Sequence, residues 1–439
     1  MKRLFLASVF FLSSSLFGQE SKTLTRIYDP IVIEGKKLSS LLGSAIDRLS
    51  LMKWKEDKFL PIPFQIDEKL ENGEYAFEQG EKAKKDSNPD FDANDELVFL
   101  AIDTGDRAPQ KTYPEGAEKG LEIEIIDPLN KNRAWVYLFC FCQKAPRSDF
   151  DYVRFEVDWK NKHKRVYSKD RFGYGLIMGS PTDAVYPDEF MVVLPDGKVM
   201  PDILDRQKIR GVIKTKFLFD IDFKFDVLTR SKLSAWTDGQ VRIIYRSDGY
   251  LKLGFFKFSG KGYSIITYYP NCLIWPMHIE VPFSLAPFIK DFELAGYMDY
   301  NENVIPAYVY SESNPSPPKI ILDGKTTQQE KSLDYTSECS WILGYKNYGA
   351  TFNRLIFPEE WKMVKKTFFL RETLDRKAPP ENDPGEIAVG YRFENFEKVL
   401  ALEATYYQIY YFLPKYEPDL EKELLNILDH PLQTEVKDF

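Results

Sequence analysis

The sequence is poor in the side chains that the best-known catalytic and metal-binding motifs require. It contains 3 histidines and 4 cysteines in 439 residues. No G-x-S-x-G nucleophile elbow, H-E-x-x-H zinc pair or C-x-x-C pair occurs in it. The glycines of residues 171–181 do not have the G-x-G-x-x-G spacing, and no helical pattern follows them. A nucleotide site and these motif-based enzyme classes are therefore not expected.

The chain also lacks an excess of positive charge. Lysine and arginine together number 59, aspartate and glutamate number 67, and the formal net charge at pH 7 is −8. A protein that binds nucleic acid needs a basic face. Nucleic acid is therefore not an expected partner.

Long hydrophobic runs are missing as well, apart from one short run at the start. Lys2 and Arg3 precede an apolar stretch over residues 4–12, and a serine-rich stretch leads to Gly18. This layout is typical of a secretory signal peptide. No later run of about 18 or more apolar residues follows. We expect residues 1–18 to be a signal peptide and the mature protein to be periplasmic or extracellular, without a membrane span. An uncleaved N-terminal anchor is the alternative.

The four cysteines do not form a disulfide framework. Cys140 and Cys142 alternate in "WVYLFCFC", so both side chains point to one face of a strand and are poorly placed to bridge each other. Cys272 and Cys339 could bridge each other or reach that strand, since export permits disulfides. Free buried thiols and one disulfide both remain open. A cysteine–histidine metal site is not favoured, because only His278 lies near a cysteine.

The patterning of the chain favours strands. Aromatic residues make up 15% of the sequence, with 33 Phe and 26 Tyr, and both prefer strands. Strict alternation over residues 212–227 predicts a long bent strand or two strands in series. Residues 390–414 favour two strands, and residues 37–51 favour a helical turn followed by a strand. Only residues 418–428 predict a short helix.

These patterns predict a mainly β protein of antiparallel β-sandwich domains with few short helices. Asp-Gly pairs between the apolar segments indicate hairpin turns. We expect an N-terminal β-sandwich module over residues 19–145, which includes an acidic loop. A larger, long-stranded antiparallel β-sandwich domain is expected over residues 146–439.

The acidic loop lies in "KKDSNPDFDANDELVFLAIDTG", residues 84–105. Its side chains resemble the D-x-N-x-D start of a calcium loop, and calcium binds such oxygen-rich sets. Phe91 stands where that loop has its glycine, and Leu97 stands where it has its final glutamate. The candidate ligands are Asp86, Asn88, Asp90, Asp92 and Asp95. The alternative is a solvated turn in which Asp95 or Glu96 caps backbone amides.

A resemblance bears on this loop. "PIPFQIDE" (61–68), the acidic loop and "DELVFLAIDTGDRAP" (95–109) resemble a module of an uncharacterised family of exported bacterial β-sandwich proteins. The segments 201–210, 239–247 and 379–393 are also similar to that family. The resemblance implies a structural calcium ion. Some relatives are associated with polysaccharide metabolism, so it also implies a polysaccharide or an envelope protein as partner. It implies no specific activity.

Two further segments contain candidate catalytic residues. Asp202, Asp205 and Arg206 lie close together, and carboxylates beside a guanidinium can bind a charged sugar or form a catalytic pair. His278 and Glu280 share one face of an expected strand and could act as a base and its partner. The alternatives are salt bridges at a domain junction for the first set and an ordinary polar strand face for the second.

Together these features favour an exported, non-catalytic binding or structural protein of the envelope or the extracellular space. The alternative is a carbohydrate-active enzyme (a lyase, hydrolase or epimerase) on a long-stranded β-sandwich. The enzyme hypothesis gains support if folding gathers both candidate sets in one aromatic-lined groove, and it loses support if they lie on separate faces.

The calcium hypothesis gives a direct thermal test. Calcium is expected to raise the melting temperature, because an ion that binds only the folded state stabilises that state. Asp92→Ala is expected to remove this effect. A melting curve that is the same with calcium and with a chelator would contradict the hypothesis.

Overall fold

The computed structural model is mainly β, with 51% of its residues in strands and 10% in helical segments. Its sheets are antiparallel, so the predicted fold class is confirmed. The described residues contain one α-helix, α2 (Leu420–Asp429), and several short 3₁₀ turns. The structure describes residues 20–168, 176–177, 186–191, 198–216, 220–224, 229–253, 256–258, 263–279, 289–315, 320–346, 349–373, 386–399 and 404–439.

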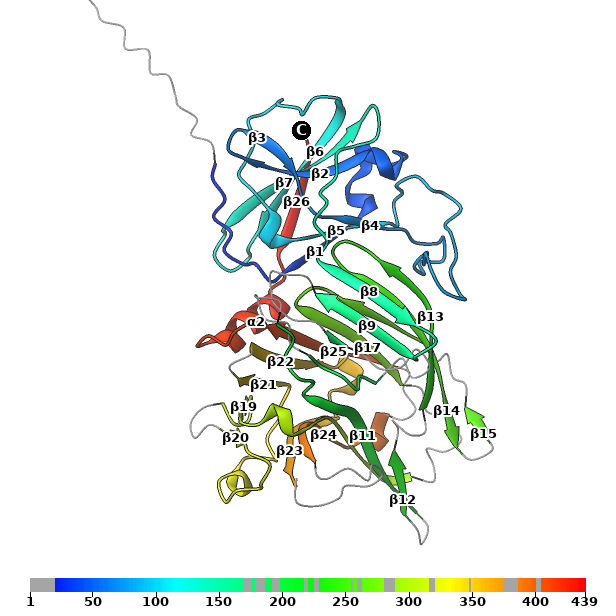
Figure 1. Cartoon of the computed structure of the whole chain (residues 1–439), viewed down its shortest axis with the longest axis vertical. Helices are drawn as coiled ribbons and strands as arrows, with labels where there is room; N and C mark the ends of the chain where they lie inside the picture. Colours follow the sequence, from blue (N-terminus) through cyan, green and yellow to red (C-terminus); the bar gives the residue numbers. More distant parts are fainter. Residues whose placement is uncertain are drawn as a thin grey trace, which may run out of the picture.

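Two sheets face each other in the upper part of the molecule (Figure 1). One has the order β1-β5-β4: β1 (Pro30–Glu34), β5 (Glu96–Leu100) and β4 (Gln65–Asp67). The other has the order β26-β6-β7-β2-β3: β26 (Gln433–Asp438), β6 (Ala117–Ile126), β7 (Arg133–Phe141), β2 (Leu49–Lys55) and β3 (Lys58–Pro61). Apolar side chains of both sheets form one core, which includes Ile31, Ile33, Leu97, Phe99, Leu121, Ile123, Val136 and Leu138. The apolar strand β7 is the central strand of its sheet.

The strand β26 comes from the far end of the chain. It pairs with β6 from Gln433↔Ile126 to Asp438↔Leu121, and it is the red strand in the upper part of Figure 1. Phe439 follows it, and its ring centroid lies 4.8 Å from that of Tyr137. The first sandwich therefore includes the last strand of the chain. The predicted boundary between the two domains, at residues 145 and 146, remains a prediction.

The lower part of the molecule contains a larger pair of sheets. A ten-stranded sheet has the order β13-β14-β16-β17-β25-β22-β21-β19-β20, with β15 beside β14. A five-stranded sheet has the order β12-β11-β18-β24-β23, and a small sheet has the order β10-β9-β8. Their bounds are β8 (Val153–Asp158), β9 (His163–Ser168), β10 (Leu176–Ile177), β11 (Leu204–Thr215), β12 (Asp220–Lys224), β13 (Thr229–Asp238), β14 (Ile243–Leu253), β15 (Phe256–Phe258), β16 (Tyr263–Tyr268), β17 (Cys272–Ile279), β18 (Ile289–Tyr300), β19 (Ala307–Ser311), β20 (Ile320–Leu322), β21 (Trp341–Lys346), β22 (Gly349–Ile356), β23 (Lys365–Glu372), β24 (Ile387–Glu394) and β25 (Ala404–Leu413).

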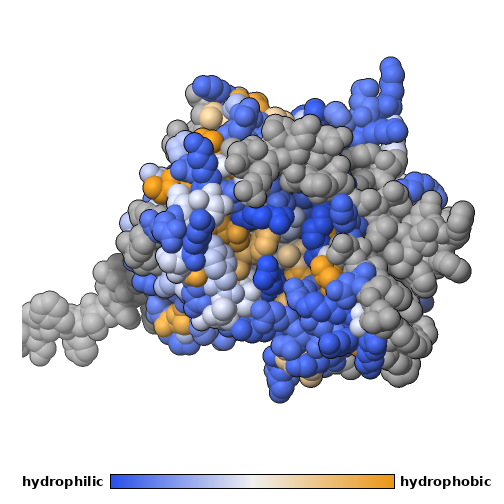
Figure 2. Space-filling model, turned by 90° about the horizontal axis from the view of Figure 1, so that it is seen from below, coloured by the Kyte–Doolittle hydropathy of each residue, from blue (hydrophilic) through white to orange (hydrophobic). Residues whose placement is uncertain are grey.

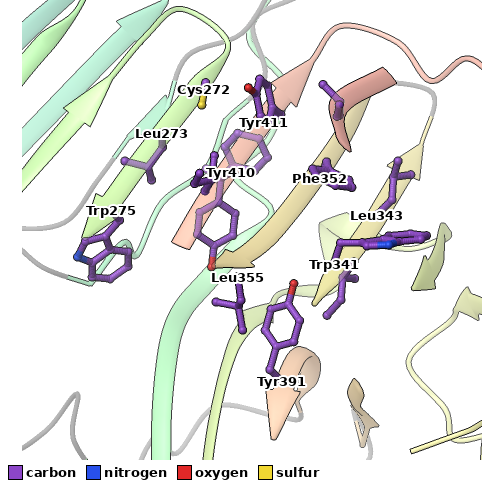
Figure 3. Close-up of a cluster of buried hydrophobic side chains, with 14 of the residues drawn as sticks. Cys272, Leu273, Trp275, Trp341, Leu343, Phe352, Leu355, Tyr391, Tyr410 and Tyr411 are labelled. Carbon is purple, nitrogen blue, oxygen red and sulfur yellow. The ribbon is translucent and has the colours of Figure 1, made fainter. Parts of the chain in front are cut away.

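Both faces of the ten-stranded sheet are buried at its centre. Tyr410 and Tyr411 are neighbours in β25 and point to opposite faces, as the alternation of a strand requires (Figure 3). On one face, Tyr410 and Tyr391 of the five-stranded sheet belong to one core. On the other face, Tyr310 of β19 donates to Glu421 of α2 at 2.8 Å. The buried residues of α2 are Leu420, Leu424 and Ile427.

The C-terminal end of α2 meets the start of the described chain. Arg26 donates through Nη1 to the carbonyl of His430 at 2.7 Å and through Nε to Asp29 at 3.1 Å. The last carbonyls of a helix lack helical partners and carry a partial negative charge, so a guanidinium stabilises them. Arg26 is 8% exposed, and its contacts tie α2 to the segment before β1.

Several predictions about single elements can be compared with the structure. The helix predicted over residues 418–428 is α2. Residues 390–414 contribute to two strands, β24 and β25, and residues 37–51 form 3₁₀ turns that lead into β2, both as predicted. Residues 212–227 contribute to two strands, β11 and β12, which fold back and pair with each other. Residues 217–219 and 225–227 of that segment lie outside the described residues.

All four cysteines are free. Cys140, Cys272 and Cys339 are buried, and Cys142 is exposed. Of the two alternatives left by the sequence, the structure therefore has free thiols. Burial raises the pKa of the Cys272 thiol, which keeps it in the neutral form.

The surface at the lower end of the molecule is mixed in character. Figure 2 shows hydrophilic residues around its rim and apolar residues in a hollow near its middle. Isolated exposed apolar side chains are normal on folded proteins. None of the helices in the described ranges has the length and apolar character to cross a bilayer.

The position of α2 gives a stability prediction. Leu424 is 0% exposed in the core of the larger part, so Leu424→Ala is expected to lower the free energy of unfolding by about 2–5 kcal/mol. Asn426→Ala, on the exposed side of the same helix, is the control and should change it by less than about 0.5 kcal/mol. Urea unfolding followed by fluorescence measures both. Equal effects of the two changes would show that α2 does not pack as described.

Candidate functional site

The acidic loop caps its own backbone. Asp86 accepts a hydrogen bond from the amide of Asn88 at 3.3 Å, and the Asn88 side chain accepts from the amide of Asp90 at 3.3 Å. Asp92 accepts from the amide of Asn94 at 3.0 Å. Asn and Asp side chains commonly bond to the backbone two residues ahead in turns. Oxygens of Asp86, Asn88 and Asp92, three of the predicted calcium ligands, are thus engaged with the backbone of the loop itself.

Asp95 holds the loop to the preceding segment. Its carboxylate accepts from the amides of Asp92 at 2.9 Å and Lys69 at 3.1 Å. Asp95 is 1% exposed, and burial raises its pKa to about 6 although these amides favour the charged form. These bonds match the capping role that was the alternative to calcium binding.

Phe91 explains why the loop departs from the calcium-loop pattern. It is 0% exposed and belongs to the core between the two upper sheets. Its amide donates to the carbonyl of Ser44 at 2.9 Å, and its carbonyl accepts from the amide of Gly43 at 2.8 Å. A glycine here would leave a cavity in the core. Within the described ranges, no three His, Cys, Asp or Glu side chains are grouped to hold a metal ion, and calcium binding stays a prediction.

The loop belongs to a longer connection, residues 68–95, that reaches the larger part of the molecule. Gln79 and Trp236 of β13 exchange backbone hydrogen bonds of 3.0 and 2.9 Å. The amide of Lys82 donates to the carbonyl of Ser234 at 2.8 Å. The connection therefore covers part of β13, which is an edge strand of the ten-stranded sheet.

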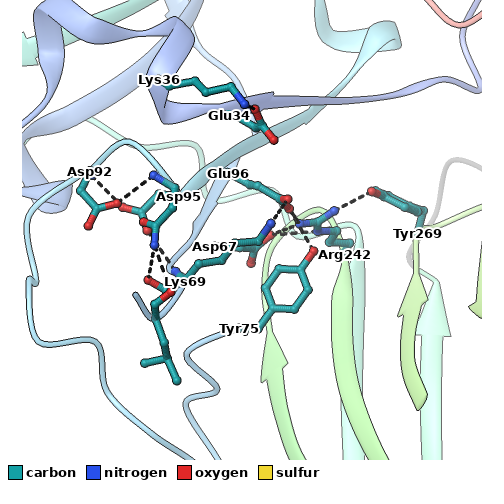
Figure 4. A network of polar contacts seen from close by, with 12 residues as sticks. Glu34, Lys36, Asp67, Lys69, Tyr75, Asp92, Asp95, Glu96, Arg242 and Tyr269 are labelled. Atoms are coloured by element: carbon teal, nitrogen blue, oxygen red, sulfur yellow. Dashed lines mark hydrogen bonds and ion pairs between the residues drawn. The ribbon is translucent and has the colours of Figure 1, made fainter. Parts of the chain in front are cut away.

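A buried arginine lies where the upper sandwich meets the larger part of the molecule (Figure 4). Arg242, just before β14, donates through Nε to Asp67 at 2.8 Å and through Nη1 to the Tyr269 hydroxyl at 2.9 Å. Its Nη2 donates to Glu96, which also pairs with Lys69. The Arg242 side chain is 5% exposed. We call Arg242, Asp67 and Glu96 the junction cluster.

Gln65 completes this contact from the upper part. Its Oε1 accepts from the amides of Val241 and Arg242, both at 2.8 Å, and its Nε2 donates to Asp67 at 2.7 Å. A Cβ on Gly239 would lie 2.3 Å from Gln65 Oε1, so a larger residue at position 239 would displace the Gln65 amide from these bonds. Strand β4 is thus bonded to the turn between β13 and β14.

The charges of the junction cluster compensate one another. Burial acts to raise the pKa of Glu96, but Arg242 and Lys69 outweigh it and lower that pKa. Burial raises the pKa of Asp67 against the attraction of Arg242. Every guanidinium nitrogen of Arg242 has a partner from the protein, so the cluster acts as a structural clamp.

Three of the segments from which the resemblance was predicted meet at this clamp. Gln65 and Asp67 belong to "PIPFQIDE", Glu96 begins "ELVFLAIDTGDRAP", and Arg242 lies in "GQVRIIYRS". The sequence marked these segments but did not indicate that they touch. Their spacing along the chain carries no information about this contact.

A second polar cluster lies on the five-stranded sheet. Lys208 of β11 pairs with Asp299 of β18, and its Nζ lies 3.6 Å from Asp205. Lys208 and Asp299 are 2% and 1% exposed. Beside them, Tyr297 donates to Glu386 at 2.8 Å. Burial raises the pKa of Asp299 to about 6 although Lys208 favours its charged form.

The candidate catalytic residues of the first set have different environments. Asp202 accepts from the amides of Phe190 at 2.7 Å and Leu204 at 3.1 Å, which is a backbone-capping role. Asp205 contacts the Lys208 cluster. Arg206 lies opposite Asp299 in the β11–β18 pairing. The set is therefore only partly brought together.

The second catalytic set cannot be placed beside the first. His278 lies in β17 of the ten-stranded sheet, where its backbone pairs with Thr405. Its side chain and Glu280 lie outside what the structure describes. The backbone of β17 belongs to a different sheet from β11, which carries Asp205 and Arg206.

A tyrosine-lined surface pocket of about 510 Å³ lies over β19 and β21, next to the edge strand β20 of the ten-stranded sheet. The rings of Tyr308 and Tyr345 stack with centroids 5.2 Å apart at 25°, and those of Tyr345 and Tyr416 stack at 3.9 Å and 13°. Tyr308 is 37% exposed. We call this site the tyrosine pocket. Its lining residues are Pro306, Tyr308, Tyr345, Lys346, Lys415 and Tyr416.

Sequence patterns did not reveal the tyrosine pocket. Its tyrosines come from β19, from β21 and from the segment after β25, and the chain contains 26 tyrosines in all. The cross-strand pair Tyr308↔Tyr345 arises only from the register of β19 against β21.

An internal cavity between the five- and ten-stranded sheets is much smaller. Its volume is about 70 Å³, and its lining is mainly apolar and includes Leu204, Leu273, Ile342 and Val389. An engineered cavity of about 150 Å³ holds one benzene molecule. This cavity is too small for a sugar and is a gap in core packing.

Removal of Arg242 tests the junction cluster. Arg242→Met is expected to lower the free energy of unfolding by about 3–5 kcal/mol, because Asp67 and Glu96 lose their buried partner. Without Arg242, Glu96 keeps Lys69 as its partner, but burial raises the folded-state pKa of Asp67 further above its unfolded value, so stability falls as pH rises through that window. The loss is therefore expected to be larger at pH 8 than at pH 5.

Urea unfolding at both pH values measures this loss. The control is Arg154→Met, which removes an exposed pair with Glu156 and should cost less than about 1 kcal/mol. The triple change Arg242→Met, Asp67→Asn, Glu96→Gln should recover part of the stability and remove the pH dependence. A pH-independent loss in the single variant would contradict the role assigned to the carboxylates.

Comparison with known proteins adds no assignment. No family model matches this sequence, and no curated protein shows significant similarity to it. The resemblance to exported β-sandwich proteins thus stays a prediction from its motifs, and the function has to be argued from the sites themselves.

Proposed function

We propose that the protein is an exported, non-catalytic glycan-binding protein of the envelope or the extracellular space. The observation that carries this proposal is the tyrosine pocket. It is an open surface pocket of about 510 Å³, and it presents stacked aromatic rings to the solvent.

The chemistry of the pocket suits a sugar ring. One face of many sugar rings carries mainly C–H groups, which pack against an aromatic ring, while the hydroxyls around the ring need hydrogen-bond partners. Tyrosine supplies both an apolar ring and a polar hydroxyl. Tyr308 offers the exposed ring, and Tyr345 and Tyr416 stack behind it. Stacking in the free protein lowers the ordering cost of binding.

The environments of the acidic residues support a non-catalytic role. Asp202 and Asp95 cap backbone amides, and Asp67 and Glu96 are held by Arg242. None of these four carboxylates lies in the tyrosine pocket, and no acid is found among the lining residues that the structure describes. Hydrolysis of a glycosidic bond in most enzymes requires two carboxylates beside the bound sugar.

A carbohydrate-active enzyme is the second candidate. The observation in its favour is the cluster of Lys208, Asp299, Tyr297 and Glu386, because a carboxyl with a perturbed pKa, such as Asp299, near a lysine and a tyrosine is common in active sites. Against it, Lys208 and Asp299 pair with each other and are almost fully buried. Such pairs also occur in purely structural networks.

A glycan-binding screen with a parallel product assay tests the proposal. The protein is expected to bind one or more polysaccharides without forming new reducing ends or unsaturated products. Tyr308→Ala should weaken binding about two- to ten-fold, the range of one aromatic contact. Its melting temperature should stay close to that of the wild type, since Tyr308 is partly exposed.

The matched control is Tyr407→Ala. Tyr407 is 44% exposed on the same sheet but does not line the pocket, so its loss should leave binding unchanged. Absence of binding to every glycan would overturn the proposal. Product formation that Asp299→Asn abolishes would establish the enzyme instead.

A further inference from the structure

The charged side chains among the described lining residues of the tyrosine pocket are of one sign. They are Lys346 and Lys415, and no aspartate or glutamate is among these described residues. The whole chain has a formal net charge of −8, so a cationic pocket contrasts with the rest of the protein. Clefts lined by one sign of charge attract ligands of the opposite sign.

Lys346 is held in place by the backbone next to the pocket. Its ammonium donates to the carbonyls of Asn303 at 2.9 Å and Ile305 at 3.0 Å. Burial lowers its pKa, because the ammonium has lost part of its hydration. A nearby anion would replace part of that lost solvation. The position of the ammonium is set before a ligand arrives, which lowers the cost of binding.

Lys415 lies on the segment between β25 and α2. Its side chain is 70% exposed and pairs with Glu417, whose side chain is 58% exposed. An exposed pair of this kind contributes little and exchanges readily with another anion. Tyr416 follows Lys415 directly, so the aromatic ring and the ammonium come from one short segment.

From this arrangement we infer that the tyrosine pocket selects anionic glycans, in which a carboxylate or sulfate group sits on or next to the stacked sugar ring. The tyrosines take the ring, and Lys346 and Lys415 take the negative charge. This inference rests on the proposed glycan-binding function and adds the class of glycan to it.

Paired polysaccharides test this selectivity. Polygalacturonate, alginate and chondroitin sulfate are each titrated into the full chain beside a counterpart without the charge: the carboxyl-reduced forms of the first two, and carboxyl-reduced, desulfated chondroitin. The expected result is a preference of at least about ten-fold for the charged member of at least one pair. This preference should fall between 50 and 300 mM salt, because screening weakens contacts of exposed charges.

Three variants test whether Lys415 causes the preference for charged glycans. Lys415→Gln should reduce the affinity for the charged member roughly two- to five-fold and leave that for the uncharged member unchanged, as expected for one exposed ion pair. The control is Lys362→Gln, since Lys362 is also exposed and pairs with a nearby glutamate, Glu359, but does not line the pocket. Tyr308→Ala should weaken both members of a pair.

The outcomes separate the two claims. Equal binding of both members of every pair, or a salt-independent preference, would overturn the anionic selectivity and leave glycan binding intact. Equal losses from Lys415→Gln and Lys362→Gln would also overturn it. Absence of binding to either member of all pairs, with no hit in the wider glycan screen, would instead overturn the proposed function.

Discussion

The architecture depends on the compensation of one buried positive charge. A guanidinium with a 5% exposed side chain is costly unless its partners are fixed around it, and Arg242 finds them in Asp67, Glu96 and Tyr269. Two of these partners come from the upper sandwich, and the arginine itself comes from the larger part. The position of β4 and β5 over the turn before β14 is therefore set by charge and hydrogen bonding as well as by apolar contact.

The sequence predicted several individual strands and the helix, but it did not predict the contacts between them. β-branched and aromatic residues predicted the strands of residues 390–414, and acids at the start of residues 418–428 favoured the helix α2, because both signals act locally. The pairing of Arg242 with Asp67 and Glu96 depends on the tertiary arrangement, so no local pattern contains it. Local patterns also did not predict how residues 212–227 pair, because their alternation fits one long strand as well as the observed hairpin.

The most conspicuous sequence motif and the best candidate site also turned out to be different places. The acidic loop attracts notice because carboxylates are dense there, yet Asp86, Asp92 and Asp95 bond to nearby amides and Phe91 fills the core. The tyrosine pocket is built from common residues that are far apart in the chain, and only the strand register assembles it. A high density of acidic residues along the chain was thus a poor indicator of a ligand site, since turns use the same acidic side chains as ligand sites do.

The pairing of β26 with β6 also bears on the order in which the molecule can be built. Residues 433–438 are synthesised after all the other strands, so β6 keeps an unpaired edge of alternating apolar and acidic residues until then. An open edge of this kind can pair with other chains. Glu122 and Glu124 of β6 pair with Arg107 and Arg133, and Lys437 of β26 adds a second positive charge at 3.7 Å from Glu124. The arrival of β26 thus completes both the hydrogen bonding and the ion pairing of this edge.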